Sequence, residues 1–180
     1  MANIKELLEK IGLGYSPVWV ESVSEKRVLC SGPYDAEDVV SESTTVGTCW
    51  EFANVVKKKG GAGIIHDAVV LAETTAIASW LSLFLHKATP TCALNDDATN
   101  TAFLLADRDI AVTQIDFPAC SDVGTGMSCS IATPSTVGNL PKAFVCNSNS
   151  TSLYGVVAIR NALDLADNTI LRIALLIEQL

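Results

Sequence analysis

Apolar and polar residues alternate along the chain from residue 49 to residue 56. Odd-numbered positions fall on one face of an extended chain, and even-numbered positions, including Trp50 and Phe52, fall on the other. The glycine-rich segment 60–63 follows, and residues 64–71 are rich in β-branched side chains. A strand, a tight turn and a second strand predict a hairpin, which is typical of an antiparallel all-β domain rather than a βαβ unit.

Short segments with strand character occupy much of the remaining chain. They span residues 17–23, 27–30, 79–85, 110–117, 128–131, 143–146, 152–160 and 170–177. The last of these is apolar enough for a helix, but it follows the turn-like residues 164–168, which favours a strand. Residues 89–99 are expected to form a polar loop, and residues 101–109 a helical turn.

A chain of 180 residues has room for one domain with a sizeable core. Many short strands in one domain predict an all-β, single-domain β-sandwich that is jelly-roll-like. We expect this domain to span residues 15–180, after a short N-terminal arm or helix over residues 1–14.

The composition indicates a surface that is poor in charge. Apolar residues make up 49% of the chain and charged residues 18%, below the roughly 25% of ordinary soluble domains. Because large exposed apolar patches are uncommon on monomers, this composition favours association with copies of the chain or with a partner. A compact monomer with a large core is the alternative.

The net charge of −8 argues against nucleic acid as a partner, because phosphate binding needs clustered Lys and Arg. The run Lys57-Lys58-Lys59 is expected to be a solvated hairpin tip, with docking on an acidic surface as the alternative. The nearly uncharged apolar run 74–85 is too short to span a bilayer, and the first ten residues lack the apolar region of a signal peptide. We therefore expect synthesis in a cytosol, a soluble product and no membrane partner.

The six cysteines are scattered along the sequence. They are Cys30, Cys49, Cys92, Cys120, Cys129 and Cys146. No C-x-x-C pair occurs, and no histidine stands at a ligand spacing, so no metal site is expected. The cysteines are predicted to be free thiols packed as small hydrophobic residues, with a disulfide between Cys120 and Cys129 as the alternative.

No constellation of catalytic residues is visible in the sequence. His66 and His86 are the only histidines, and each is expected to be an ordinary strand residue. A G-x-S-x-G motif is absent, and 60–63 is not a phosphate loop. The acidic pairs 96–97, 107–109 and 164–167 are expected to form caps and turns. The sequence predicts no enzyme, with no catalytic residues and no cofactor.

The aromatic residues bear on a rival function, the binding of carbohydrate. Trp19, Trp50 and Trp80 lie in strand-like segments, where burial in a core or an interface is the more frequent outcome. Tyr34 lies near a turn and is the better candidate for an exposed aromatic platform.

The order of several short motifs resembles a family of small virion proteins of tailed bacteriophages. They are a tyrosine–acidic turn (34–40), a phenylalanine–asparagine strand with a glycine turn (52–65), a leucine–phenylalanine strand (81–85), an aspartate turn (106–110) and a leucine–tyrosine–glycine strand (153–160). The resemblance covers residues 15–178. This chain departs from the family at Ser41-Glu42-Ser43, where relatives carry glycine, and it is richer in cysteine.

The resemblance implies a capsid decoration or cement protein, which is a structural protein of the virion. Such a β-sandwich subunit would be synthesised in the host cytoplasm, assemble as a homotrimer and bind the major capsid protein on the capsid exterior to reinforce the shell. The alternative is a tail-associated or neck-associated β-sandwich that binds host surface carbohydrate, because one sandwich fold hosts many functions.

Overall fold

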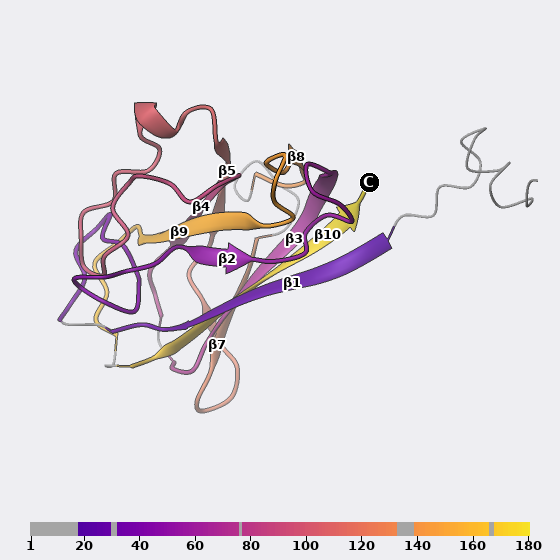
Figure 1. The fold of residues 1–180 in the computed structure, drawn as a ribbon. Coiled ribbons are helices and arrows are strands. Elements are labelled where there is room, and N and C mark those ends of the chain that lie inside the picture. The colour runs from indigo at the N-terminus through magenta and orange to yellow at the C-terminus, as the bar shows by residue number, and fades with distance from the viewer. Residues whose placement is uncertain (1–17, 30–31, 76, 133–138, 166–167) are drawn as a thin grey trace, which may run out of the picture.

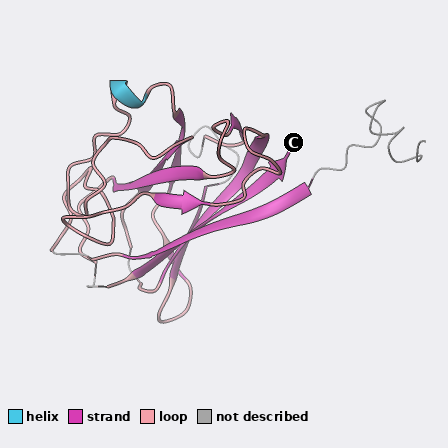
Figure 2. Cartoon of the chain, in the orientation of Figure 1, coloured by secondary structure: helices cyan, strands magenta, loops and turns pink. Residues whose placement is uncertain are grey.

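The computed structural model describes residues 18–29, 32–75, 77–132, 139–165 and 168–180. Within these ranges the chain forms ten strands and one turn of 3-10 helix, arranged as two antiparallel sheets (Figures 1 and 2). The elements are β1 (Val18–Arg27), β2 (Trp50–Phe52), β3 (Ala62–Ala72), β4 (Leu81–His86), η1 (Leu105–Asp107), β5 (Ala111–Phe117), β6 (Ser121–Asp122), β7 (Ser128–Ala132), β8 (Lys142–Val145), β9 (Leu153–Ile159) and β10 (Ile170–Gln179). The predicted all-β fold is confirmed.

The strand order is that of a jelly roll. One sheet has six strands in the order β1-β10-β3-β7-β6, with β8 also paired to β3, and the other has the order β2-β9-β4-β5. The pairs β1–β10, β2–β9, β3–β7 and β4–β5 are nested, as if one long hairpin had been rolled up. This nesting matches the jelly-roll-like sandwich expected from the sequence.

The core lies between the two sheets and follows the two-residue period of the strands. In β10, Leu171, Ile173, Leu175 and Ile177 are buried, whereas Arg172 and Leu176 between them are exposed. This alternation explains why 170–177 forms a strand rather than a helix. The largest fully buried side chains come from both sheets, and they include Trp50, Phe52, Ile65, Leu83, Ile115, Phe117 and Leu153.

The hairpin predicted between residues 49–56 and 64–71 does not form. β2 pairs with β9 in the four-stranded sheet, whereas β3 belongs to the six-stranded sheet. The alternation of residues 49–56 ends after Phe52, because the backbone turns at Asn54 (φ 57°) and both Val55 and Val56 are buried. The chain therefore crosses from one sheet to the other at this point.

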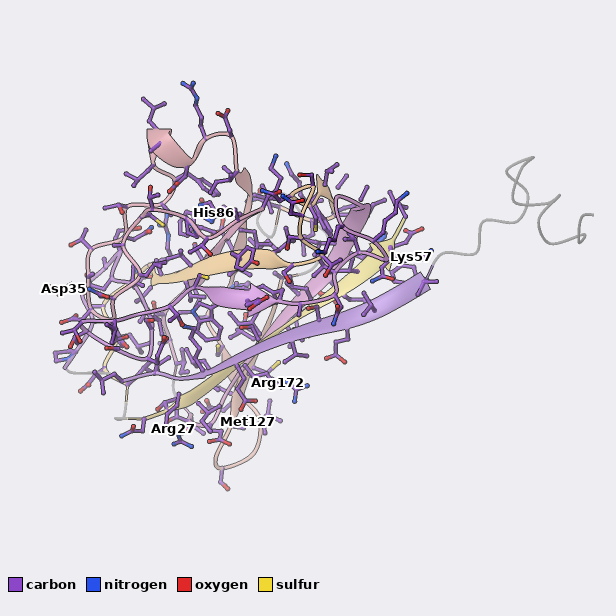
Figure 3. All side chains as sticks on the ribbon, in the orientation of Figure 1. Arg27, Asp35, Lys57, His86, Met127 and Arg172 are labelled. Atoms are coloured by element: carbon purple, nitrogen blue, oxygen red, sulfur yellow. The ribbon has the colours of Figure 1, made fainter. Side chains whose placement is uncertain are left out.

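The glycine turn and the lysine run lie on this crossing. Gly60 has a φ of 69°, which suits glycine, and its N–H bonds to the carbonyl oxygens of Asn147 and Ser150. Lys57 (labelled in Figure 3), Lys58 and Lys59 are exposed, as expected, but they lie on a crossing between the sheets rather than at a hairpin tip.

The first two predicted strands, 17–23 and 27–30, are replaced by the single strand β1. Ser24, a polar residue at an inward position, lies in the gap between these two predicted strands. Ser22 and Ser24 are both buried, and the Ser22 hydroxyl donates to the carbonyl oxygen of Ala53 at 2.8 Å. The predicted arm 1–14 and Cys30 lie outside the described residues.

The other predicted elements agree with the structure to within a few residues. β3, β4, β5, β7, β8 and β9 fall on the predicted strands, and η1 falls inside the predicted helical turn. The polar loop 89–99 lies within the long connection 87–110 between β4 and β5.

Glu42 joins β1 to the loop that precedes β2. Its carboxylate accepts hydrogen bonds from Lys26 on β1, from the Thr48 backbone and hydroxyl, and from the Ser41 hydroxyl. The Lys26 ammonium also lies 5.7 Å from the centre of the Trp50 ring. Burial alone would raise the pKa of Glu42, but these hydrogen bonds outweigh it and hold the pKa at about 2.

We expect the substitution Glu42→Gln to lower the free energy of unfolding at pH 7 by about 1–2 kcal/mol, because it removes a charged acceptor that is partly screened by solvent. The native pKa of Glu42 lies below the ordinary value of 4.5, so its contribution is complete above that value and is lost as the pH falls towards 2. Denaturant unfolding of both proteins across this pH range measures the difference. A gap between them that stays constant down to pH 2 would contradict this assignment.

Candidate interaction face

The outer face of the six-stranded sheet carries a row of apolar residues that crosses four strands. The row consists of Val23 on β1, Ala174 on β10, Val69 on β3 and Ile131 on β7, which lie opposite one another in the strand register. Val23 is 37% exposed and Ile131 is 47% exposed, although both are large apolar residues in regular strands. We call these four residues the apolar row.

The row continues into neighbouring apolar positions and is bordered by acidic side chains. Leu176 on β10 is 40% exposed and lies between Glu21 and Asp67 in the register. A shallow cavity of about 220 Å³ lies beside it, lined by Glu21, Asp67, Val69, Ala174 and Leu176. An apolar centre with a polar rim is the usual anatomy of a protein interface.

A second hollow of about 180 Å³ lies on the same face, where β3 ends and β10 begins. It is lined by Glu25, Leu71, Ala72, Glu73, Met127, Ile170 and Arg172. Figure 3 shows Arg172 and Met127 on the side of the molecule opposite to His86. The face thus combines apolar side chains with Glu21, Glu25, Asp67 and Glu73 at its rim.

The outer face of the four-stranded sheet is different, because the chain itself covers it. All six residues of β4 are buried, so β4 has neighbours on both of its faces. Its outward residue Phe84 packs with Val39, Cys92, Val156 and Ala158. In Figure 1, the β4–β5 connection and η1 lie on the side of β4 and β9 that faces away from β1. Of the two sheets, the six-stranded one leaves apolar side chains open to solvent.

The aromatic residues do not lie where the sequence suggested. Trp50 is buried as expected, but Trp19 is 50% exposed and Trp80 is 41% exposed. Tyr34, the expected platform, is buried, and its hydroxyl donates to a carboxylate oxygen of Asp96 at 2.7 Å. Trp19 lies in β1 on the same outward side as Glu21 and Val23, and Trp80 precedes β4, so neither is enclosed by both sheets.

The two histidines have different surroundings. His66 Nε2 lies 3.0 Å from Glu178 Oε2 on the adjacent strand, and its ring lies beside the Trp19 ring with centroids 4.8 Å apart. His86 ends β4 and is fully buried, with the Phe103 ring 5.0 Å away. No sequence pattern connects His86 with other polar residues, but in the structure Cys92 and Asp107 lie next to it.

The five described cysteines are free thiols, in agreement with the sequence prediction. Ser121 and Cys129 are opposite each other in the β6–β7 pair, which places Cys120 beside Cys129 without a disulfide between them. Burial raises the pKa of Cys92, Cys120 and Cys146 to about 11, so these thiols are protonated near neutral pH.

The acidic pairs anchor loops, as predicted for turn residues. Asp96 is buried and accepts hydrogen bonds from the Tyr34 hydroxyl and from the Ser41 N–H at 2.8 Å. Asp107 is buried and accepts hydrogen bonds from Thr91. Asp164 is exposed, and the last residue of the third pair lies outside the described ranges.

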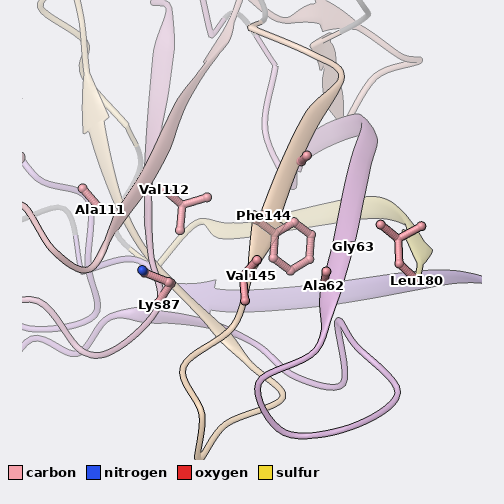
Figure 4. A pocket seen from close by; sticks show the side chains of 9 residues that line it. Ala62, Gly63, Lys87, Ala111, Val112, Phe144, Val145 and Leu180 are labelled. Atoms are coloured by element: carbon pink, nitrogen blue, oxygen red, sulfur yellow. The ribbon is translucent and has the colours of Figure 1, made fainter.

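A further hollow of about 390 Å³ lies between the ends of β3 and β8 and the start of β5 (Figure 4). It is lined by Ala62, Gly63, Lys87, Ala111, Val112, Ala143, Phe144, Val145 and Leu180. Lys87 is the only ionisable side chain among the described residues that line this hollow.

Comparisons with known proteins add little to these observations. No family model matches the sequence, and no curated protein matches it. Among solved structures, a chain of Desmodium yellow mottle tymovirus is similar at 12% identity and a TM-score of 0.27, over 92% of this chain and 88% of that one. A similarity at this level carries no argument about fold or function. Among the described residues, no helix is long and apolar enough to cross a membrane.

Asp97 provides a test of the electrostatics in the acidic loop. It is exposed and has a φ of 62°. Desolvation, the charges of Asp38, Asp96 and Asp35 and a hydrogen bond with Asp38 all raise its pKa. A raised native pKa means that the folded state binds more protons than the unfolded state, so this group destabilises the fold as the pH rises through its native pKa.

We therefore expect Asp97→Asn to raise the melting temperature at pH 7, since asparagine tolerates a positive φ and removes the repulsion. The gain should shrink towards acidic pH, where Asp97 itself is protonated. Thermal unfolding at several pH values measures the effect, with Asp122→Asn on the exposed β6 as the control. A gain that is independent of pH would rule out the electrostatic explanation.

Proposed function

We propose that this chain is a structural protein of a tailed-bacteriophage virion, a decoration or cement protein that binds the outer capsid surface as an oligomer. The observation that carries the proposal is the apolar row on the outer face of the six-stranded sheet, where Val23 and Ile131 are exposed. Exposed apolar side chains on a sheet face do not stabilise a monomer, whereas a subunit of an assembly can bury them against its neighbour. The motif resemblance supports the same function.

The fold is compatible with this role but does not select it. Jelly rolls form viral capsid subunits, and they also form lectins and cupins. The acidic net charge of −8 supports partners made of protein rather than nucleic acid. The partners in this proposal are a second and third copy of the chain and the major capsid protein, with no membrane, cofactor or catalytic activity involved. The protein would be synthesised in the host cytoplasm and reside on the capsid exterior.

We assign the apolar row to contacts between copies in a homotrimer. Apolar residues from β1, β10, β3 and β7 lie in one line, so a partner strand or sheet could cover all four at once. The acidic side chains of Glu21, Glu25 and Asp67 would remain at the rim, where solvent keeps them hydrated.

The alternative function, binding of host surface carbohydrate by a tail or neck module, has one observation in its favour. Trp19 and Trp80 expose about half of their surface, and exposed aromatic rings are suitable platforms for sugars. Trp19 also lies beside His66 and Glu178, which offer polar groups next to the ring.

The first test of the proposal is the oligomeric state. In light scattering, we expect the wild-type protein to have the mass of a trimer and Val23→Lys to have the mass of a monomer. A lysine ammonium in the apolar row is costly to bury in an interface unless an opposite charge faces it. Val46→Lys is the matched control, since Val46 is a valine that is 75% exposed in a loop away from the row. A wild-type monomer at micromolar concentration, or a Val23→Lys trimer, would contradict the assignment of the row.

The second test separates the two functions on the virus particle. Particles that lack this protein should release DNA at lower temperature than complete particles, because each missing subunit removes contacts between capsid proteins. Adsorption to host cells should be unchanged, also for Trp19→Ala and Trp80→Ala. Particles with normal heat resistance and defective adsorption would replace the cement function with carbohydrate binding.

A further inference from the structure

Three potential metal ligands meet under the connection that covers the four-stranded sheet. His86 is the last residue of β4, Cys92 lies in the connection 87–110, and Asp107 ends η1. A His nitrogen, the Cys sulfur and a carboxylate oxygen lie within 4.8 Å of one another. Their exposed fractions are 0%, 6% and 2%, so the cluster is enclosed by protein.

His86 is the observation that calls for a ligand. Among the described residues, neither of its ring nitrogens has a hydrogen-bond partner, although both are buried. The carbonyl groups of Phe84 and Tyr154 are near enough to raise its pKa, but neither has the geometry of a hydrogen bond. A buried imidazole without a partner is costly, and a bound ion or a buried water would remove the cost.

Burial and a nearby carboxylate shift the pKa of the His86 ring in opposite directions. Burial lowers the pKa of His86, and the nearby Asp107 charge opposes this only in part.

Asp107 is already held in a fixed orientation. Its carboxylate accepts hydrogen bonds from the Thr91 N–H at 2.9 Å and from the Thr91 hydroxyl at 3.0 Å. These bonds use only part of the carboxylate's capacity as an acceptor and restrain its rotation. Metal sites commonly contain such supporting hydrogen bonds to a ligand.

The donor types select the metal. Ca²⁺ and Mg²⁺ prefer oxygen donors, so a cluster with imidazole and thiol groups is a poor site for either. Zn²⁺ takes nitrogen, sulfur and oxygen ligands, and its bond lengths place the donors of a tetrahedral site about 3.3–3.8 Å apart. The cluster needs only a small contraction to reach this spacing.

We propose that His86, Cys92 and Asp107 form a zinc site that fastens the β4–β5 connection to the four-stranded sheet. The site goes beyond the proposed virion role, and it would be present whichever partner the protein binds. Zinc would join the end of β4 to two points of the long connection. The Cys92 thiol would lose its proton on binding, so affinity should fall as the pH is lowered.

The test uses the full chain, stripped with a chelator and reloaded with Zn²⁺ or Co²⁺. We expect the wild-type protein to bind one equivalent of zinc. At a free zinc concentration of 100 times Kd, its melting temperature should be about 5–10 °C higher than without zinc. With Co²⁺ it should show the charge-transfer absorption of a cobalt–thiolate bond. Cys92→Ser should lose this absorption and bind zinc at least about 100-fold more weakly.

Two matched controls make the result specific. Cys146→Ser changes a thiol that is buried to a similar extent, and His66→Gln changes the other histidine; both should bind zinc like the wild type. A second measurement needs no variant: zinc should slow alkylation of Cys92 in the wild-type protein and leave Cys129 unaffected. Absence of zinc binding by the wild type, or a cobalt–thiolate absorption that survives in Cys92→Ser, would overturn the proposal.

Discussion

β4 is buried on both of its faces, and the arrangement of the remaining chain follows from this burial. Its inward residues Leu81, Leu83 and Leu85 complete the core between the sheets, while Phe84 and His86 face the other way. A sheet face with such residues must be covered, and the connection 87–110 covers it. A connection of this length would be costly to order on its own, so its contacts with β4 and β9 have to offset that cost.

The outer faces of the two sheets therefore differ in how far they are covered. The four-stranded sheet is enclosed by its partner sheet on one side and by the chain's own connection on the other. The six-stranded sheet has an enclosed inner face and an outer face where Val23, Ile131 and Leu176 remain exposed. Because a fold of this kind hosts many functions, the difference between the two outer faces says more about function than the topology does.

The sequence predicted the strands well where alternation was regular, as in β3, β5 and β10. It failed where a polar residue faces the core, because the buried Ser24 lies where the sequence indicated a break in β1. The hairpin expected between residues 49–56 and 64–71 was also wrong, because strand pairing depends on segments that lie far apart in the sequence. β2 pairs with β9, about a hundred residues later. The apolar row and the His86 cluster could not be found from sequence for the same reason, because their members come together only through the register and the covering connection.

The position of β10 has a consequence for how the chain reaches this structure. β10 lies between β1 and β3, and both of those strands precede it by a long stretch of chain. Until β10 has left the ribosome, β1 has no partner strand among the described residues, and one edge of β3 is unpaired. An open edge of this kind can pair with another chain, so the growing polypeptide is exposed to misassembly until β10 is available. When β10 inserts, it pairs with β1 and with β3 at the same time, so the larger sheet is completed in a single step.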